Sequence, residues 1–69
     1  MAITLKRARL LSEMTQVETA RKLGVHRQTY MRWEKNPDEI PVGKAKEVSI
    51  LFDVGVDELF FNRESTLSR

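Results

Sequence analysis

Four polar side chains between positions 27 and 32 carry hydrogen-bonding groups suited to the edges of nucleotide bases. They are Arg27, Gln28, Thr29 and Arg32. Arginine can donate two hydrogen bonds to O6 and N7 of guanine, and glutamine can pair in the same two-point manner with N6 and N7 of adenine. The same residues could also form an ordinary solvated helix face, so their interpretation depends on the elements that position them.

The segment before these residues has the signals of a short helix with a defined start and end. The tetrapeptide Thr15-Gln16-Val17-Glu18 has the form of a capping box, in which the threonine hydroxyl and the glutamate carboxylate each bind a backbone N–H group of the other residue. A helix beginning at Gln16 is therefore expected, and Gly24 provides the left-handed conformation at which helices often end. The apolar residues on its expected inner face are Val17, Ala20 and Leu23.

A second short helix is expected directly after the turn, over residues 27–35. His26 stands at the position that caps this helix. Pro37 ends it, because proline disfavours helical geometry in the residue before it. Tyr30 and Trp33 are predicted to face the core. Two helices joined by such a glycine-containing turn form a helix-turn-helix unit.

The outward face of the helix over residues 27–35 is predicted to present Arg27, Gln28, Met31 and Arg32, with Thr29 at its edge. In a helix-turn-helix unit, residues near the N-terminus of the second helix are the ones that reach base edges in the major groove. Arg27 and Gln28 occupy these positions. The pattern therefore favours groove contacts over a merely solvated face.

The regions on either side of this unit also predict helices. Residues 3–13 form one helical candidate. Pro41 at a first helical position starts another helix, which Gly55 ends, and residues 56–61 make a short last helix. The residues at inward spacing are Leu5, Ala8 and then Leu11 or Ser12 in the first of these helices, and Ala45, Val48, Leu51 and Phe52 in the next.

The whole chain is expected to be all-α, with one domain of five short helices over residues 1–61. Its 69 residues leave room for a single small domain with a modest core. Residues 62–69 have little to bury and are expected to form a frayed tail. The sequence contains no internal repeat, no low-complexity segment and no strand-like alternation.

The composition argues against several classes of function. The chain has no cysteine, which rules out disulfides and thiolate metal sites and fits a reducing cytosol. A single histidine makes neither a metal site nor a catalytic triad, and there is no glycine-rich phosphate loop. An enzyme, a metal site and a bound cofactor are therefore not expected. No apolar run is long enough to cross a bilayer and no signal peptide opens the chain, so a soluble cytoplasmic protein is expected.

Charge is divided unequally along the chain. Residues 1–36 carry eight basic and three acidic side chains, a net charge of +5, whereas residues 37–69 carry four basic and seven acidic ones, a net charge of −3. Such a division suggests that one part of the surface meets an anionic partner, although ordinary helix-surface charge explains it equally well.

The order of these signals resembles the Cro and repressor type of phage helix-turn-helix domain, a family that is also widespread among bacterial regulators. The stretch "MTQVETARKLGVHRQTYMRWE" is similar to the family's usual form, in which Thr-Gln opens the second helix, Leu-Gly-Val makes the turn, and Arg-Gln-Thr leads the third helix before Trp-Glu. The ending "IPVGKAKEVSILFDVGVDELFF" resembles the family's last two helices. The resemblance covers residues 5–61 and implies a compact, lambda-repressor-like domain of five helices.

The resemblance also implies a role for individual residues. Base edges would be contacted from the third helix, by Arg27, Gln28, Thr29 and Arg32. Phosphates would be contacted from the start of the second helix, from the loop after the third and from early in the fourth, by Gln16, Lys35, Asn36 and Lys44. Arg9 and Glu34 occupy positions that form an internal ion pair in family members, so they are interpreted as structural.

Three residues depart from the family's usual pattern. His26 replaces the serine or threonine that usually caps the third helix, which weakens the cap by about 1 kcal/mol unless the imidazole accepts the hydrogen bond. A phosphate contact is the other role expected of His26. Met31 places an apolar side chain at an exposed position toward the groove. Thr19 stands where many members have leucine, which should loosen the core slightly.

The resemblance implies a sequence-specific transcriptional regulator that places its third helix in the major groove of double-stranded operator DNA, in the cytoplasm of a bacterial host. A homodimer, at least on DNA, would match a two-fold symmetric operator. Its candidate contacts are Leu59, Phe60, Phe61 and Leu67. The alternative is an antirepressor or modulator that uses the same fold to bind a repressor protein, and exposed Met31 supports this alternative.

Overall fold

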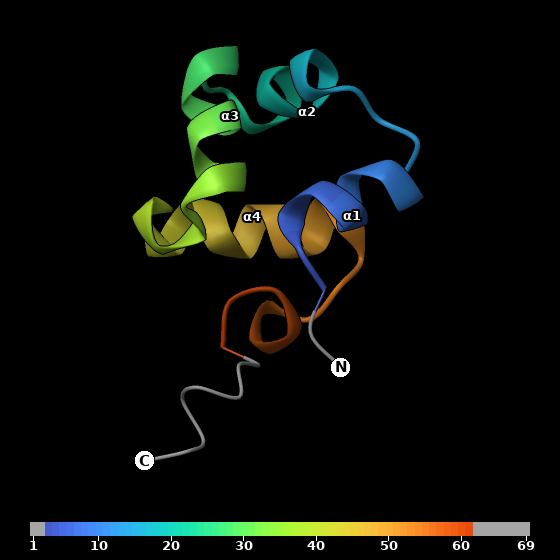
Figure 1. The fold of residues 1–69 in the computed structure, drawn as a ribbon, viewed down its shortest axis with the longest axis vertical. Coiled ribbons are helices and arrows are strands. Elements are labelled where there is room, and N and C mark those ends of the chain that lie inside the picture. Colours follow the sequence, from blue (N-terminus) through green and yellow to red (C-terminus); the bar gives the residue numbers. More distant parts are fainter. Residues whose placement is uncertain (1–2, 62–69) are drawn as a thin grey trace.

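The computed structural model of the protein describes residues 3–61, and every regular element within them is helical. The elements in chain order are α1 (Leu5–Leu11), α2 (Gln16–Leu23), α3 (Arg27–Lys35), the 3₁₀ turn η1 (Pro37–Glu39), α4 (Val42–Phe52) and the π-helical turn η2 (Asp57–Phe61). Figure 1 shows α4 across the middle of the molecule, with the α2–α3 pair on one side of it and η2 on the other. The all-α expectation is confirmed, whereas the predicted tail over residues 62–69 lies outside the described residues.

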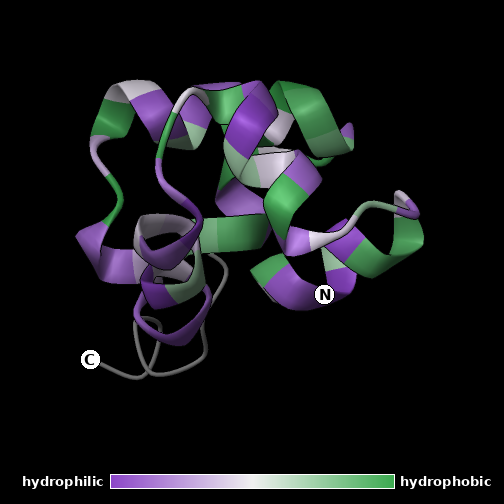
Figure 2. Ribbon diagram, turned by 90° about the horizontal axis from the view of Figure 1, so that it is seen from above, coloured by the Kyte–Doolittle hydropathy of each residue, from purple (hydrophilic) through white to green (hydrophobic). Residues whose placement is uncertain are grey.

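One apolar core holds these elements together. Each short helix has an apolar face that must be covered, and each of α1, α2, α3, α4 and η2 contributes at least one buried side chain. Figure 2 shows hydrophobic and hydrophilic residues alternating along the helices, as this arrangement requires. The buried apolar residues are Leu5, Ala8, Ala20, Leu23, Tyr30, Trp33, Ile40, Val48, Phe52 and Leu59.

The inner face of α2 differs from the predicted one. Val17 is 44% exposed, so its predicted place in the core is wrong, and Thr19 is fully buried instead. The remaining buried residues of α2, Ala20 and Leu23, agree with the prediction. Thr19 is tolerated in the core because its hydroxyl donates to Thr15 O at 2.9 Å, which leaves only the methyl group to pack.

The first helix is shorter than predicted at both ends. Thr4 caps α1, its Oγ1 accepting from Arg7 N at 3.0 Å, and the helix ends at Leu11. It stops there because Glu13 adopts a left-handed conformation with φ of 58°. Of the two inward candidates, Leu11 is 67% exposed and Ser12 is the one that is half-buried.

The ends of α4 also differ slightly from the prediction. Pro41 precedes the first helical residue, Val42, instead of occupying that position itself. The helix ends at Phe52, before the Gly55 predicted to end it, and Asp53 takes a left-handed conformation with φ of 56°. Aspartate can adopt this conformation because its short polar side chain tolerates it better than most side chains do.

Candidate nucleic-acid interface

The start of α2 is held by the capping box that the sequence predicts. Glu18 N donates to Thr15 Oγ1 at 3.0 Å, and Thr15 N donates to Glu18 Oε1 at 2.9 Å. The hydrogen bond from the Thr15 backbone is the main cause that lowers the pKa of the Glu18 carboxyl. The first turn of α2 is thereby fixed, with Gln16 as its first helical residue.

The turn between α2 and α3 is fixed by a glycine and by a lysine from α4. Gly24 has the left-handed conformation that ends α2, with φ of 71°. Lys44 Nζ donates to Leu23 O at 2.6 Å and lies 3.2 Å from Glu47 Oε1. The phosphate contact predicted for Lys44 finds no support in these contacts, which give its ammonium group a structural role at the end of α2.

The imidazole of His26 caps α3. His26 Nδ1 accepts a hydrogen bond from Gln28 N at 3.2 Å, so the condition for an effective cap at this position is met. A neutral imidazole that accepts at Nδ1 carries its proton on Nε2. Nε2 is therefore the atom with which His26 would donate to a phosphate.

The two faces of α3 have different environments. Tyr30 and Trp33 are buried in the core, as predicted, and they anchor the inner face of the helix. The outer face consists of exposed Arg27, Gln28 and Arg32 and half-buried Thr29 and Met31. The candidate base-contacting residues therefore lie together on the surface that α3 turns away from the core.

One of these residues, Arg32, has a partner within the protein. Arg32 Nε lies 3.2 Å from Oε1 of Glu39 in η1, and the two side chains are 61% and 49% exposed. An ion pair this exposed contributes at most about 1 kcal/mol. A phosphate or a base could therefore take the place of Glu39 at small cost.

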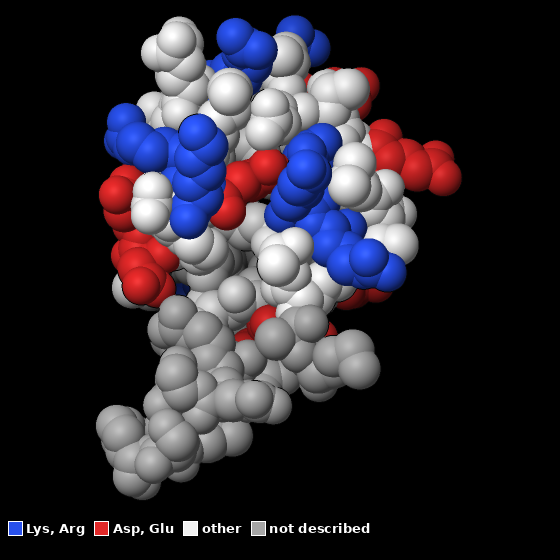
Figure 3. All heavy atoms as spheres, viewed as in Figure 1, with Lys and Arg blue, Asp and Glu red and all other residues white. Residues whose placement is uncertain are grey.

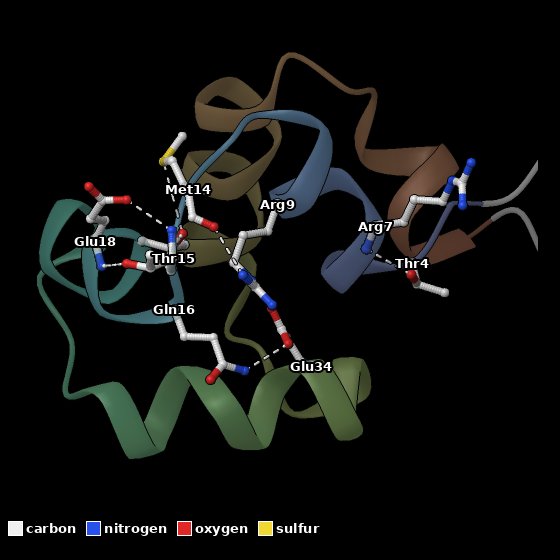
Figure 4. Close-up of polar contacts among 9 residues, drawn as sticks. Thr4, Arg7, Arg9, Met14, Thr15, Gln16, Glu18 and Glu34 are labelled. Carbon is white, nitrogen blue, oxygen red and sulfur yellow. Dashed lines mark hydrogen bonds and ion pairs between the residues drawn. The ribbon is translucent and has the colours of Figure 1, made fainter.

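A nearly buried ion pair connects α1, α2 and α3 (Figure 4). Arg9 Nε donates to Glu34 Oε2 at 2.6 Å, and Arg9 Nη1 donates to Met14 O at 3.0 Å. Gln16 Nε2 donates to the other carboxylate oxygen of Glu34, Oε1, at 3.0 Å. The Arg9 and Glu34 side chains are only 9% and 8% exposed. The internal pair implied by the family resemblance is thus formed, and Gln16 joins it as a third member.

The surroundings of Glu34 favour its ionised form. Burial opposes ionisation, but the hydrogen bonds led by the one from Arg9 outweigh it, and the pKa of the carboxyl is lowered. The hydrogen bond to Glu34 is also the main cause that raises the pKa of Arg9. Both groups are therefore charged at neutral pH, and each compensates the desolvation of the other.

Gln16 is a candidate phosphate contact whose side chain is held in place by a hydrogen bond within the protein. A glutamine amide has two N–H donors, and Glu34 accepts from the nitrogen that carries them. One donor remains for a phosphate, and the bond to Glu34 holds the amide in place. The backbone N–H groups in the first turn of α2 lie at the same end of the helix.

Lys6, a basic residue on α1 that no sequence motif indicates, lies close to this end of α2. Lys6 lines a hollow of about 250 Å³ together with Gln16, Met31, Glu34 and Lys35. Lys6 precedes Arg9 by three positions, and this spacing, which places two residues on one helix face, is the signal that could have revealed it. The other candidate phosphate contacts, Lys35 and Asn36, are exposed at the C-terminal end of α3.

Basic side chains gather on the face of the molecule that shows α1 and α3. In Figure 3, Lys and Arg atoms lie over both helices, with a small number of acidic atoms between them. This distribution agrees with the net charge of +5 on residues 1–36. A surface of this kind attracts a polyanion through its long-range field.

The sequence model of the helix-turn-helix family matches residues 5–59, a span that begins at the start of α1 and ends within η2. The chain belongs to the Cro/C1-type helix-turn-helix family. No curated protein and no solved structure matches it.

As a Cro/C1-type helix-turn-helix protein, the chain is a DNA-binding regulator of transcription, and α2 and α3 form its helix-turn-helix unit. The ligand of this family is double-stranded DNA. Among residues 3–61, no helix of this family member is long and apolar enough to cross a membrane.

Proposed function

We propose that this protein recognises a specific operator by placing α3 in the major groove. The observation that carries the proposal is the two-sided environment of α3. Tyr30 and Trp33 anchor one face in the core, while Arg27 and Gln28 are exposed at the N-terminal end of the helix. Because the inner face is anchored, the outer side chains are presented in a defined direction, which base recognition requires.

Each side chain on the outer face has a role that its chemistry allows. Arg27 donates two hydrogen bonds to O6 and N7 of a guanine, and Gln28 pairs with N6 and N7 of an adenine. Thr29, which is half-buried at the edge of the face, contacts a thymine methyl or a phosphate. Arg32 leaves its weak pair with Glu39 and contacts a base or a phosphate farther along α3.

Phosphate contacts on both sides of the groove would fix the position of α3. One phosphate accepts hydrogen bonds from the second amide hydrogen of Gln16 and from the backbone N–H groups at the start of α2. His26 also donates to a phosphate, through Nε2. Lys35 and Asn36 contact the backbone beyond the other end of α3. Lys6 shares a hollow with Gln16 and Lys35, which supports adding it to this group.

We also propose that two copies bind a two-fold symmetric operator whose half-sites are about one helical turn apart. Two of the four candidate dimer contacts already pack within the protein. Leu59 is buried in the core and Phe60 packs against it, so both already have an intramolecular role. The side chain of Phe61 and all of Leu67 lie outside the described part of the chain.

The test is selection from a library of random duplexes of operator length, repeated at two salt concentrations. We expect enrichment of a palindromic sequence. Because each neutralised phosphate releases counterions, we also expect the affinity for that sequence to fall steeply as salt rises. The variant Arg27→Ala, selected in parallel, should enrich a sequence that is relaxed at one position in each half-site.

Failure to enrich any sequence, with only weak binding at low salt, would contradict the proposal. The antirepressor alternative would then be favoured, because an apolar protein interface shows little dependence on salt. Enrichment of a single asymmetric site would retain DNA recognition and contradict only the proposed two-fold arrangement.

A further inference from the structure

Met31 is an apolar side chain placed among polar ones on the outer face of α3. Two hollows meet at this residue, with volumes of about 240 and 250 Å³. Of the described residues that line either hollow, Met31 is the one that is apolar. In the first hollow its neighbours are Gln28, Arg32 and Lys35. In the second they are Lys6, Gln16, Glu34 and Lys35.

The fold does not account for an apolar residue at this position. The partly buried apolar residues that pack against the core are Ile3, Met14, Val25, Ala45, Leu51, Val54 and Phe60, and Met31 is not one of them. Met31 is half-buried by its polar neighbours and contributes nothing to the core. The exposed part of its apolar surface is therefore available to a ligand, and contact with an apolar group would remove it from water.

The charges around Met31 indicate what kind of ligand carries that apolar group. Lys6, Arg32 and Lys35 line the hollows on either side and would attract phosphates. With phosphates bound at the flanks, the residue between them faces the base edges. The apolar group that B-DNA presents in its major groove is the 5-methyl group of thymine.

We propose that Met31 is a specificity-determining residue that contacts the 5-methyl group of an operator thymine. This inference rests on the proposed function. Met31 follows Gln28 by three residues, about 4.5 Å along the axis of α3. This is close to the spacing of about 3.4 Å between bases along one strand, so the thymine lies next to the base pair that Gln28 contacts. The flexible, polarisable thioether can adapt its shape to a methyl group.

The experiment replaces each thymine of the selected operator, one at a time, by deoxyuridine. This change keeps the base pair and removes only the methyl group. At one thymine in each half-site, we expect the replacement to weaken binding by about fourfold, the effect of exposing one buried carbon group. Affinities of the 69-residue chain are measured at one fixed salt concentration.

Two variants test whether the weaker binding of the deoxyuridine duplex depends on the Met31 side chain. Met31→Ala should lose about fourfold in affinity for the unmodified operator and should bind the thymine and deoxyuridine duplexes equally well at that position. Ile50→Ala, which removes an apolar side chain that is 80% exposed on α4, should behave like the wild type. Thermal unfolding of each variant checks that the fold is retained.

The outcomes separate this inference from the function on which it rests. If every deoxyuridine duplex binds like the unmodified operator, or if the effect persists unchanged in Met31→Ala, the inference is wrong while the proposed function stands. Unchanged DNA affinity of Met31→Ala would favour a protein partner for this side chain. If no operator is enriched at all, the proposed function and the inference fail together.

Discussion

The α2–α3 region and the α4–η2 region of this protein are positioned by different kinds of interaction. Directional contacts hold α2 and α3, namely the capping box, the His26 cap and the buried Arg9–Glu34 pair. In the α4–η2 region, Val48, Phe52 and Leu59 pack in the core and α4 begins without a side-chain cap, so side-chain hydrogen bonds to the backbone, such as that of Lys44 to Leu23 O, add to mainly apolar packing. Beside it lies an apolar hollow of about 410 Å³, lined from η1, α4 and the segment around η2.

The two regions also differ in charge. Residues 15–36 carry five basic and two acidic side chains, whereas residues 37–61 carry two basic and six acidic ones. Apolar contact is non-directional, but a hydrogen bond restricts the rotation of a helix about its own axis. The caps and the buried ion pair thus occur in the region that we propose to contact a rigid duplex in one orientation.

The largest expected effect comes from breaking the buried pair. Glu34→Ala leaves the Arg9 guanidinium buried without its carboxylate partner and should lower the free energy of unfolding by about 3–5 kcal/mol. Urea denaturation measures this change. The matched control is Glu39→Ala, which breaks the exposed pair with Arg32 and should cost less than about 1 kcal/mol. Similar losses in both variants would mean that the buried pair does not position α3.

Acid should weaken the Arg9–Glu34 pair by protonating Glu34, without any substitution in the protein. The unfolded-state pKa of glutamate is about 4.3, and the folded-state pKa of Glu34 is lower. The native state therefore binds fewer protons than the unfolded state in this range. The stability that Glu34 contributes is present above about pH 4.3 and is lost as the pH falls through the lowered pKa.

Unfolding measured between pH 7 and pH 3 should thus show a steeper loss of stability for the wild type than for Glu34→Gln. Glu18 has a lowered pKa as well, but it is present in both proteins, so the difference between the two curves isolates Glu34. Parallel curves would show that Glu34 is not the group whose protonation destabilises the fold.

The comparison of the two regions also predicts where base preference resides. Arg27→Ala should reduce discrimination at one base pair by about 1–3 kcal/mol. Lys35→Ala should weaken binding to all sequences alike and lower the salt slope by about 1. Lys46→Ala, on α4, should change neither the discrimination nor the salt slope. Competition binding with single-base operator variants distinguishes these outcomes, and a uniform loss from Arg27→Ala would contradict its assignment to a base.

Sequence reasoning predicted the α2–α3 region well because its signals are local. The capping box, Gly24 and the His26 cap each act within a few residues, so the bounds of α2 and α3 agree with those expected. The end of α4 is predicted at Gly55, whereas the helix ends at Phe52 and Asp53 occupies the left-handed position that a glycine more often takes.

The errors occur where a residue's environment depends on distant parts of the chain. Spacing alone predicts Val17 for the inner face of α2, but Val17 is 44% exposed and Thr19 is buried, a core position that the family resemblance implies and the spacing does not. The bond from Gln16 to Glu34 spans 18 residues, and the bond from Lys44 to Leu23 O spans 21. Nothing in the local sequence of these residues indicates their partners.

The same substitution at two glycines offers the finest comparison of the two regions. Gly24 has φ of +71°, a conformation that costs a residue with a Cβ atom about 1–2 kcal/mol. Gly43 lies in α4 and has open space where a Cβ would project. Gly24→Ala should therefore destabilise the fold by about 1–2 kcal/mol, whereas Gly43→Ala should stabilise it by about 0.5–1 kcal/mol because alanine restricts the unfolded chain.

Thermal unfolding of both variants measures the two expected changes in stability, which have opposite signs. A Cβ at Gly24 would approach no atom closer than Lys44 Nζ at 4.0 Å, so a loss there reports backbone conformation and not a clash. If Gly24→Ala were neutral, the turn would tolerate another conformation, and the direction of α3 would have to be maintained by the Arg9–Glu34 pair and its bond to Gln16. Opposite signs would instead show that the left-handed turn before α3 depends on glycine, while the start of α4 can still be stabilised.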